Sequence, residues 1–316
     1  MATKLKVGVV GTGGWGKNHL RVFHDLDALE CLCDIDAARA QGWAEKYRCK
    51  AYTDIGKMLD SEKLDAVTVC TPTTTHYTVA SKILKRRINT FVEKPMTSTS
   101  AEGQKVLEIA KDSGAFLTVG YIERFNPAVA DAKEAIKNKS LGEPLLLEFH
   151  RENKWMGTIT DVGIVADTSV HDIDTARWLL DEEPHVVFAR VGKVLSEKRE
   201  DFAAITLGFN ARKTAFIVSN WVTPKRMRLL TVVCTGGMMT LDFISQEVRF
   251  DIEAETKIPR RASKEPLVAE MEAFLDSLRN GRQPLVKPKD GLNNTIIAEA
   301  ALASSESGSP VYLNLK

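Results

Sequence analysis

A glycine-rich segment that directly follows a short apolar run constrains the fold of this chain more than any other feature. The run covers residues 5–10, and the next six residues carry glycine at Gly11, Gly13 and Gly16 before residues 17–23, which predict a helix. In such a strand–turn–helix the first glycine permits a tight turn, the second lets the backbone approach a pyrophosphate, and the third brings the helix against the strand. The helix N-terminus also favours anions. This segment therefore predicts a dinucleotide-binding βαβ unit.

The first 120 residues alternate short apolar runs with amphipathic segments. We predict strands near residues 5–10, 29–34, 66–71, 90–92 and 116–120. We predict helices near residues 15–25, 36–47, 76–87 and 99–113. This alternation is typical of a parallel Rossmann sheet with helices on both faces, an α/β arrangement.

The pattern changes near residue 144, where longer β-like runs begin. They cover residues 144–149, 186–194, 202–209, 214–222, 227–233 and 238–243, and the main helices predicted among them cover 167–180 and 268–280. We therefore expect an α+β domain with a large, mostly antiparallel, open-faced sheet. A chain of 316 residues exceeds what one hydrophobic core usually covers, so we predict a Rossmann domain at 1–123 and a substrate-binding and oligomerisation domain at 124–316.

The composition argues against several classes of partner. The 43 Lys and Arg balance 42 Asp and Glu, so we expect neither nucleic acid nor an acidic membrane as partner. The N-terminal apolar run is too short for a signal peptide or a membrane span, so we expect a cytoplasmic protein. The five cysteines form no CxxC pair and no zinc-like cluster with histidine, which predicts reduced core thiols and no metal site.

An acidic residue at the end of the second predicted strand indicates which dinucleotide binds. Asp34 lies eighteen residues after Gly16, where a carboxylate can accept hydrogen bonds from the adenosine ribose. Its charge would repel a 2′-phosphate, and the next residue is Ile35 and not an arginine, so we predict NAD as the cofactor. Asp36 is the alternative for the ribose contact, although its position equally suits a helix N-cap.

Two further polar segments follow strands of the predicted parallel sheet. The first contains Thr71, Pro72 and His76, and the second contains Glu93 and Lys94 before Pro95. Ligands of open α/β sheets bind at the carboxyl ends of the strands, so we expect both segments beside the cofactor. His76 suits a capping or packing role as well as a ligand contact.

In this order, Gly-x-Gly-x-x-Gly, Thr-Pro-x-x-x-His and Glu-Lys-Pro closely resemble the glucose–fructose oxidoreductase and inositol dehydrogenase family, Gfo/Idh/MocA. The resemblance spans nearly the whole chain and is reinforced by GYIERFNP at residues 120–127 and DTSVHDID at residues 167–174. It implies that Lys94, Asp167 and His171 form the catalytic group, and that the peptide bond before Pro95 is cis.

The residue types themselves agree with that chemistry. Asp167 and His171 are four apart in a predicted helix, so their side chains would share one face. A neutral histidine near a carboxylate is a good general base, and Lys94 could stabilise a developing alkoxide. His171 would then take the proton of a secondary alcohol while hydride moves to the nicotinamide, giving a ketone. The alternative is a surface pair on an amphipathic helix.

The resemblance also bears on the substrate. Residues 121–127 and 161–174 are most similar to UDP-N-acetylglucosamine 3-dehydrogenases, which implies a sugar-nucleotide substrate. Those enzymes carry an arginine-rich segment where this chain has Arg151 and Lys154 as the cations for a diphosphate. A polyol or inositol dehydrogenase, and a non-catalytic sensor of NAD or sugar, are the alternatives. Intact Lys94, Asp167 and His171 favour an enzyme.

Three sets of predictions follow for the site and the assembly. The residues expected at the cofactor are Gly11, Thr12, Gly13, Gly14, Trp15, Gly16, Asp34, Thr71, Pro72, His76, Glu93 and Lys94. The residues expected at the substrate are Arg124, Asn126, Arg151 and Asp174. The helices of the second half are too few to cover both faces of its sheet, so we predict a homodimer or homotetramer built through the uncovered face.

Overall fold

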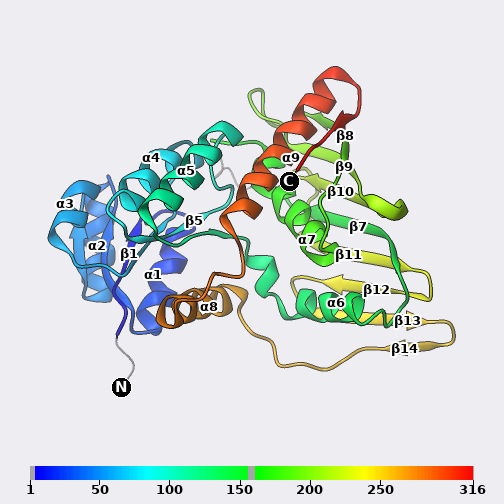
Figure 1. Ribbon diagram of the computed structural model, residues 1–316, viewed down its shortest axis with the longest axis horizontal. Helices are drawn as coiled ribbons and strands as arrows, with labels where there is room; N and C mark the ends of the chain where they lie inside the picture. Colours follow the sequence, from blue (N-terminus) through cyan, green and yellow to red (C-terminus); the bar gives the residue numbers. More distant parts are fainter. Residues whose placement is uncertain (1–3, 156–160, 316) are drawn as a thin grey trace. The chain divides into compact units, whose positions relative to one another are not determined.

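The computed structural model describes residues 4–155 and 161–315, and the chain divides into two compact units (Figure 1). The first unit contains the residues up to Tyr121 together with Leu267–Thr295. The second contains Ile122–Pro266 and the residues from Ile296 onward.

Within the described residues, the first unit is built on six parallel strands in the order β3-β2-β1-β4-β5-β6. Its strands are β1 (Val7–Val10), β2 (Leu29–Cys33), β3 (Lys50–Tyr52), β4 (Ala66–Val69), β5 (Asn89–Glu93) and β6 (Leu117–Gly120). Every residue of β1, β4 and β6 is buried, because a parallel sheet has helices on both faces.

The helices of this unit contact one another in two groups, as expected for one helical layer on each face of the sheet. They are α1 (Gly16–Asp25), α2 (Ala37–Tyr47), α3 (Ile55–Ser61), α4 (Thr73–Leu84), α5 (Ser100–Ser113) and α8 (Pro266–Asn280). Helix α1 contacts α2, and α4 contacts both α3 and α5. The predicted Rossmann fold is confirmed. The sequence missed β3 and α3, which are too short to show a clear hydrophobic period.

The segment Leu267–Thr295 belongs to the first unit, whereas the predicted division placed all of residues 124–316 in the second domain. Phe274 of α8 packs its ring edge-on against Phe91 of β5, with centroids 5.6 Å apart. The hydroxyl of Thr118 donates a hydrogen bond of 2.8 Å to the carbonyl of Val286. The amphipathic pattern of α8 predicts its buried face and gives no information about which core that face contacts.

Within the described residues, the second unit is built on nine strands in the order β14-β13-β12-β11-β7-β10-β9-β8-β15. They are β7 (Pro144–Glu152), β8 (Val186–Gly192), β9 (Phe202–Gly208), β10 (Thr214–Asn220), β11 (Met227–Cys234), β12 (Gly237–Asp242), β13 (Glu247–Ile252), β14 (Glu255–Lys257) and β15 (Val311–Tyr312). All neighbours are antiparallel except β7 and β10, which confirms the mostly antiparallel sheet.

The second unit also contains six helical segments among its described residues, and they include the predicted positions of Asp167 and His171. They are η1 (Ile122–Phe125), α6 (Pro127–Lys137), the turn η2 (Val165–Ser169), α7 (Val170–Leu180), η3 (Asn210–Arg212) and the later part of α9 (Pro288–Ser307). The sequence predicted α7 and missed α6 and α9. Helix α6 contacts β12 and β13, and α7 contacts β7 and β10.

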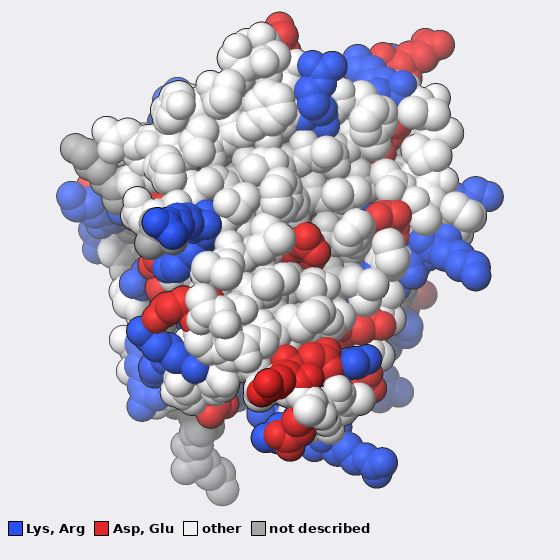
Figure 2. Space-filling view, turned by 90° about the vertical axis from the view of Figure 1, so that its right-hand side faces the viewer, with Lys and Arg blue, Asp and Glu red and all other residues white. Residues whose placement is uncertain are grey.

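The two faces of the sheet differ in what they present. Buried residues such as Leu147, Phe149 and Ile217 alternate with residues of the opposite face. That opposite face, which we call the open face, carries Phe188, Phe202, Phe216 and Met238, each more than a third exposed. Figure 2, which is turned by 90° from Figure 1, shows a surface with a broad zone that has few charged side chains. Lys, Arg, Asp and Glu are more frequent around the margin of this zone. The expected apolar open face is therefore present.

Two smaller expectations concern cysteines and membranes. Cys31, Cys33 and Cys234 are buried and reduced, and burial raises the pKa of the Cys33 thiol to about 11, which suits a packing role. Among the described residues, no helix combines the length and the apolar character that crossing a membrane requires.

Candidate active site

The glycine-rich loop leaves bare backbone where a dinucleotide phosphate would bind. Gly11 has a φ of +83°, and a Cβ there would lie 2.7 Å from the amide nitrogen of Thr71. A Cβ at Gly16 would lie 1.8 Å from the carbonyl oxygen of Gly11. By contrast, a Cβ at Gly14 would meet no described atom within 4 Å. No side chain caps the N-terminus of α1, where the amides of Lys17 and Asn18 bond to backbone carbonyls, so the positive end of the helix dipole is left for an anion. The loop fits a pyrophosphate.

Asp34 fastens this loop to the end of β2. Its Oδ2 accepts hydrogen bonds of 2.8 Å from both the amide and the hydroxyl of Thr12, and its Oδ1 accepts one of 3.0 Å from the amide of Asp36. Burial opposes ionisation, but these hydrogen bonds and the charge of Arg39 outweigh it and hold the pKa of Asp34 below its usual value. Nη1 of Arg39 adds contacts of 3.3 and 3.4 Å to the two oxygens, so the roughly four acceptor sites of the carboxylate are taken and a ribose hydroxyl would replace the longer Arg39 contacts.

Arg39 is a residue of this region that the sequence did not single out. Its guanidinium lies 3.3 Å from Asp34 Oδ1 and 3.0 Å from Asp36 Oδ2. Asp36 also caps α2, because its carboxylate accepts a hydrogen bond of 3.0 Å from the amide of Arg39. The capping role left open for Asp36 is thus present in the structure. The signal that could have indicated Arg39 is its place in the first turn of α2, next to two acids.

His76 connects the loops that follow β4 and β5. Its ring is buried, with Nδ1 2.9 Å from the carbonyl oxygen of Pro95 and Nε2 2.9 Å from that of Thr71. The ring therefore joins the two segments that the sequence predicted beside the cofactor. The structure shows the packing role that the sequence allowed for His76, and its contact with the cofactor stays a prediction.

Glu93 connects the loop after β5 to helix α1. Its Oε1 lies 2.8 Å from Nε2 of His19, which is fully buried in α1, and its Oε2 accepts a hydrogen bond of 3.2 Å from the amide of Lys94. Lys94 follows with a half-buried side chain, and its bond to Pro95 is cis, as the resemblance implied. His19 was missed, although a polar residue on the apolar face of an amphipathic helix is a signal for it.

In the second unit, the predicted helix over residues 167–180 begins as a different kind of turn. Residues Val165–Ser169 form a π-turn, in which the amide of Val170 bonds to the carbonyl of Val165, five residues back. Asp167 lies within this turn and His171 lies in the first turn of α7. The four-residue spacing therefore no longer guarantees a shared face. Turns of this kind occur frequently at functional sites.

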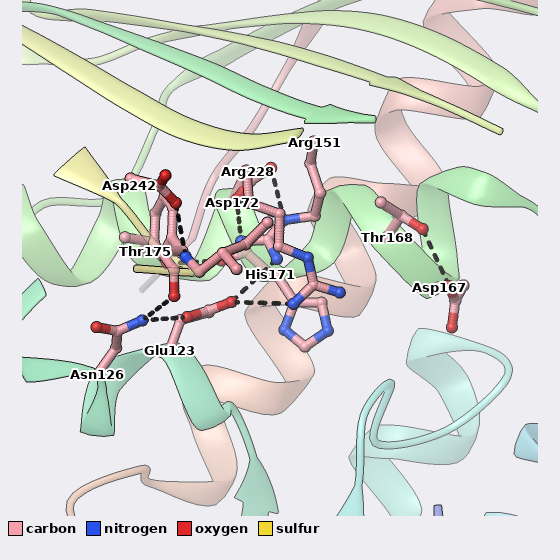
Figure 3. A network of polar contacts seen from close by, with 12 residues as sticks. Glu123, Asn126, Arg151, Asp167, Thr168, His171, Asp172, Thr175, Arg228 and Asp242 are labelled. Carbon is pink, nitrogen blue, oxygen red and sulfur yellow. Dashed lines mark hydrogen bonds and ion pairs between the residues drawn. The ribbon is translucent and has the colours of Figure 1, made fainter. Parts of the chain in front are cut away.

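Next to His171 in the sequence, Asp172 belongs to a buried ion-pair network (Figure 3). Arg151 of β7 donates to Asp172 through Nε and Nη2, at 3.0 and 2.7 Å to Oδ1, and through Nη1 to Glu123 at 3.0 Å. Both Arg151 and Asp172 are at most 2% exposed. Burial would lower the pKa of Arg151, but the facing carboxylates raise it. Burial also raises the pKa of Asp172 against the charge of Arg151, but the pair is ionised, because neutralising either group would leave the other as an uncompensated buried charge.

Two more pairs extend this network. Arg124 forms a bidentate pair with Asp174, at 2.8 Å from Nε to Oδ2 and 2.6 Å from Nη2 to Oδ1. Arg228 lies 3.8 Å from Glu123, and burial together with the like charge of Arg151 lowers the pKa of Arg228 to about 10. These contacts attach η1 and β7 to helix α7 and bring β11 beside η1.

Asn126 has a capping role in the same region. Its Oδ1 accepts a hydrogen bond from the amide of Ala128 at the start of α6, and its Nδ2 donates to Glu123 and to the carbonyl of Phe243. The four residues predicted at the substrate, Arg124, Asn126, Arg151 and Asp174, therefore all bond to neighbours in their own unit. Direct substrate contact by any of them stays a prediction.

The fold and the features of its two units define the class of protein to which the chain belongs. A Rossmann sheet with an open glycine cradle and an acidic residue after β2 is a nicotinamide dinucleotide-binding domain, here joined to an α+β unit with an open-faced sheet. Residues 5–121 match the family model described as "Oxidoreductase family, NAD-binding Rossmann fold", and residues 129–240 match "GFO/IDH/MocA C-terminal domain". The chain belongs to the Gfo/Idh/MocA family of NAD-binding oxidoreductases.

Relatives with known names fall into more than one substrate class. An inositol 2-dehydrogenase of Rubrobacter xylanophilus is 28% identical, over 97% of this chain and 92% of that protein. A UDP-N-acetylglucosamine 3-dehydrogenase of Acidithiobacillus ferrooxidans is 25% identical, over 94% of this chain and 95% of that protein. The crystal structure of an oxidoreductase from Agrobacterium radiobacter, in complex with NAD+, L-tartaric acid and magnesium, superimposes with a TM-score of 0.91 over 98% of each chain at 18% identity, which shows a shared fold.

The buried network generates a stability prediction. Arg151→Met leaves Asp172 buried without its bonded counter-ion and Glu123 with only Arg228 at 3.8 Å, so the free energy of unfolding should fall by about 3–5 kcal/mol. Urea denaturation followed by circular dichroism measures it. Arg260→Met, at an exposed position between β14 and α8, is the control and should change stability by less than about 0.5 kcal/mol. A loss of similar size in both variants would contradict the account of the network.

Asp34 generates a prediction about cofactor choice. The unmodified protein should bind NAD more tightly than NADP, and Asp34→Asn should shift the ratio of the two dissociation constants toward NADP by about tenfold. The variant removes a repulsive charge and releases Arg39 for a phosphate. Titration calorimetry with both cofactors measures the ratio. Asp36→Asn is the matched control, and a larger shift there than at Asp34 would assign the ribose contact to Asp36.

Proposed function

We propose that this chain oxidises a secondary hydroxyl group of a sugar, polyol or sugar nucleotide to a ketone, with NAD as the hydride acceptor. The observation that carries the proposal is the combination, in one family member, of a glycine loop and Asp34 suited to NAD with intact Lys94, Asp167 and His171. A sensor that binds NAD or sugar without turnover would not need Lys94, Asp167 and His171.

Each of the three residues has a distinct task in this proposal. His171 accepts the proton of the substrate hydroxyl, since a neutral imidazole is an effective base near pH 7. Asp167 would supply the negative charge that stabilises the imidazolium formed once His171 has taken the proton. Lys94 stabilises the alkoxide that develops on the substrate oxygen. NAD, bound at the glycine loop, supplies the hydride-accepting nicotinamide ring.

The buried state of Arg151 bears on the choice among substrates. Of the two cations expected to meet a diphosphate, Arg151 is committed to Asp172 and Glu123, which leaves Lys154. This favours an uncharged polyol or sugar, the class to which the name of the inositol 2-dehydrogenase points. The similarity to the UDP-N-acetylglucosamine 3-dehydrogenase supports a nucleotide sugar as the second candidate.

A substrate panel tests the proposed function. The purified protein is incubated with NAD and inositols, free hexoses, N-acetylglucosamine and UDP-N-acetylglucosamine, and the absorbance of NADH is followed. We expect turnover with at least one member, at a higher kcat/KM for inositols or free sugars than for the UDP-sugar. NAD binding without turnover of any member would favour the sensor instead.

The catalytic assignment predicts the effect of two substitutions. His171→Ala should lower kcat about 10²–10⁴-fold, the usual contribution of a positioned acid–base group. Lys94→Ala should also lower kcat more than it raises KM, since the lost charge acts mainly on the transition state. In both variants, the affinity for NAD by calorimetry should stay close to that of the unmodified protein. A fully active His171→Ala would contradict the assignment.

The open face of the second sheet predicts self-association. We propose that two or four copies associate through this face, because burying Phe188, Phe202 and Phe216 removes apolar surface from water. Light scattering should give a mass that is a multiple of 35.0 kDa, and Phe216→Glu should lower it. Ile35→Glu, at a 94% exposed position of the first unit, is the control. A mass of one chain for the unmodified protein at micromolar concentration would overturn the proposal.

A further inference from the structure

The hydroxyl of Thr168 departs from the usual behaviour of threonine in helices. Helical threonines commonly donate back to the carbonyl four residues earlier, as Thr175 does to His171 at 2.8 Å and Thr295 does to Gly291 at 3.0 Å. Thr168 Oγ1 instead donates to the side chain of its neighbour, at 3.0 Å from Oδ2 of Asp167. Figure 3 shows this pair set apart from the Arg151 network. The hydroxyl therefore serves a carboxylate of the proposed catalytic group.

A buried tryptophan fixes the direction of this hydrogen bond. Nε1 of Trp221 lies 3.2 Å from Thr168 Oγ1. An indole N–H can donate but not accept, whereas a hydroxyl has one proton and two lone pairs. The hydroxyl of Thr168 must therefore accept from Trp221, and its own proton remains for Asp167. Hydrogen bonds aligned in this way polarise and strengthen one another.

Both ends of this arrangement are held by the fold. Trp221 is 3% exposed, its amide donates to the carbonyl of Asp201, and its own carbonyl accepts from the amide of Trp155. The π-turn is attached to β10 a second time by the hydrogen bond of 3.0 Å between the hydroxyls of Ser169 and Ser219, both fully buried. Adjacent residues of a regular α-helix do not face each other, and the contact between Thr168 and Asp167 lies within the π-turn.

We propose that Trp221 and Thr168 are positioning residues for the dehydrogenase reaction, acting as a two-step hydrogen-bond relay that holds the Asp167 carboxylate in its working orientation. The inference rests on the proposed function, because it assigns the relay to the same site. The relay leaves the charge on Asp167 and restricts the rotation of its side chain, so its contribution appears in turnover and not in cofactor affinity.

The test compares four variants of the full chain with NAD and the best substrate of the panel. Thr168→Val keeps the shape of the side chain and removes the hydroxyl, and it should lower kcat about tenfold while leaving KM and the NAD affinity within about twofold. Thr168→Ser should restore most of the lost kcat, because it returns the hydroxyl. Trp221→Phe should lower kcat in the unmodified background and have no further effect when combined with Thr168→Val.

The outcomes separate the relay from the proposed function. Full activity of Thr168→Val, failure of Thr168→Ser to restore kcat, or additive effects of the two substitutions would overturn the relay. Asp167→Asn tests the proposed function itself, since an unchanged kcat in this variant would remove Asp167 from the catalytic group. A crystal structure of Thr168→Val gives a readout without substrate: the Asp167 carboxylate should leave its present rotamer, and an unchanged rotamer would overturn the relay.

Discussion

The ion-pair network around Arg151 is the interaction on which the second unit depends most. A guanidinium and a carboxylate buried to this degree are costly to remove from water, and the pair persists only when nearly every donor and acceptor has a partner. Arg151 meets that condition by donating to Asp172 and Glu123 together. Because Asp172 directly follows His171, the bond that anchors Asp172 also limits where the imidazole of His171 can lie.

The first unit uses its polar motif residues in the same way. His76 and Glu93 belong to the motifs that predicted a cofactor site, and both also hold parts of the first unit together, His76 by bonding to Thr71 and Pro95 and Glu93 by bonding to His19. A dinucleotide site needs backbone held at fixed positions, and buried polar side chains can hold two loops with directional bonds that apolar packing lacks. Motif residues can therefore support a site without touching its ligand.

The sequence predicted those features that depend on local pattern. They are the glycine loop, the alternation of strands and helices, and the residue types at Lys94, Asp167 and His171. The family resemblance assigned these features to one kind of enzyme. Tertiary packing decides the rest. The attachment of α8 to the first unit, the pairing of Arg39 with Asp34 and the contact of Trp221 with Thr168 join residues whose proximity no hydrophobic period encodes. The π-turn at Val165–Ser169 was also missed, because its sequence is compatible with an ordinary helix.

The transfer of hydrogen from substrate carbon to the cofactor tests the central claim most directly. The protein would be incubated with unlabelled NAD and with inositol, hexose and UDP-sugar substrates deuterated at their carbon-bound positions, and the reduced cofactor would be examined by mass spectrometry. The account predicts reduced NAD that carries one deuterium from the substrate, because the carbon-bound hydrogen moves as hydride. Reduced NAD without deuterium, or no reduced NAD with any of these substrates, would contradict it.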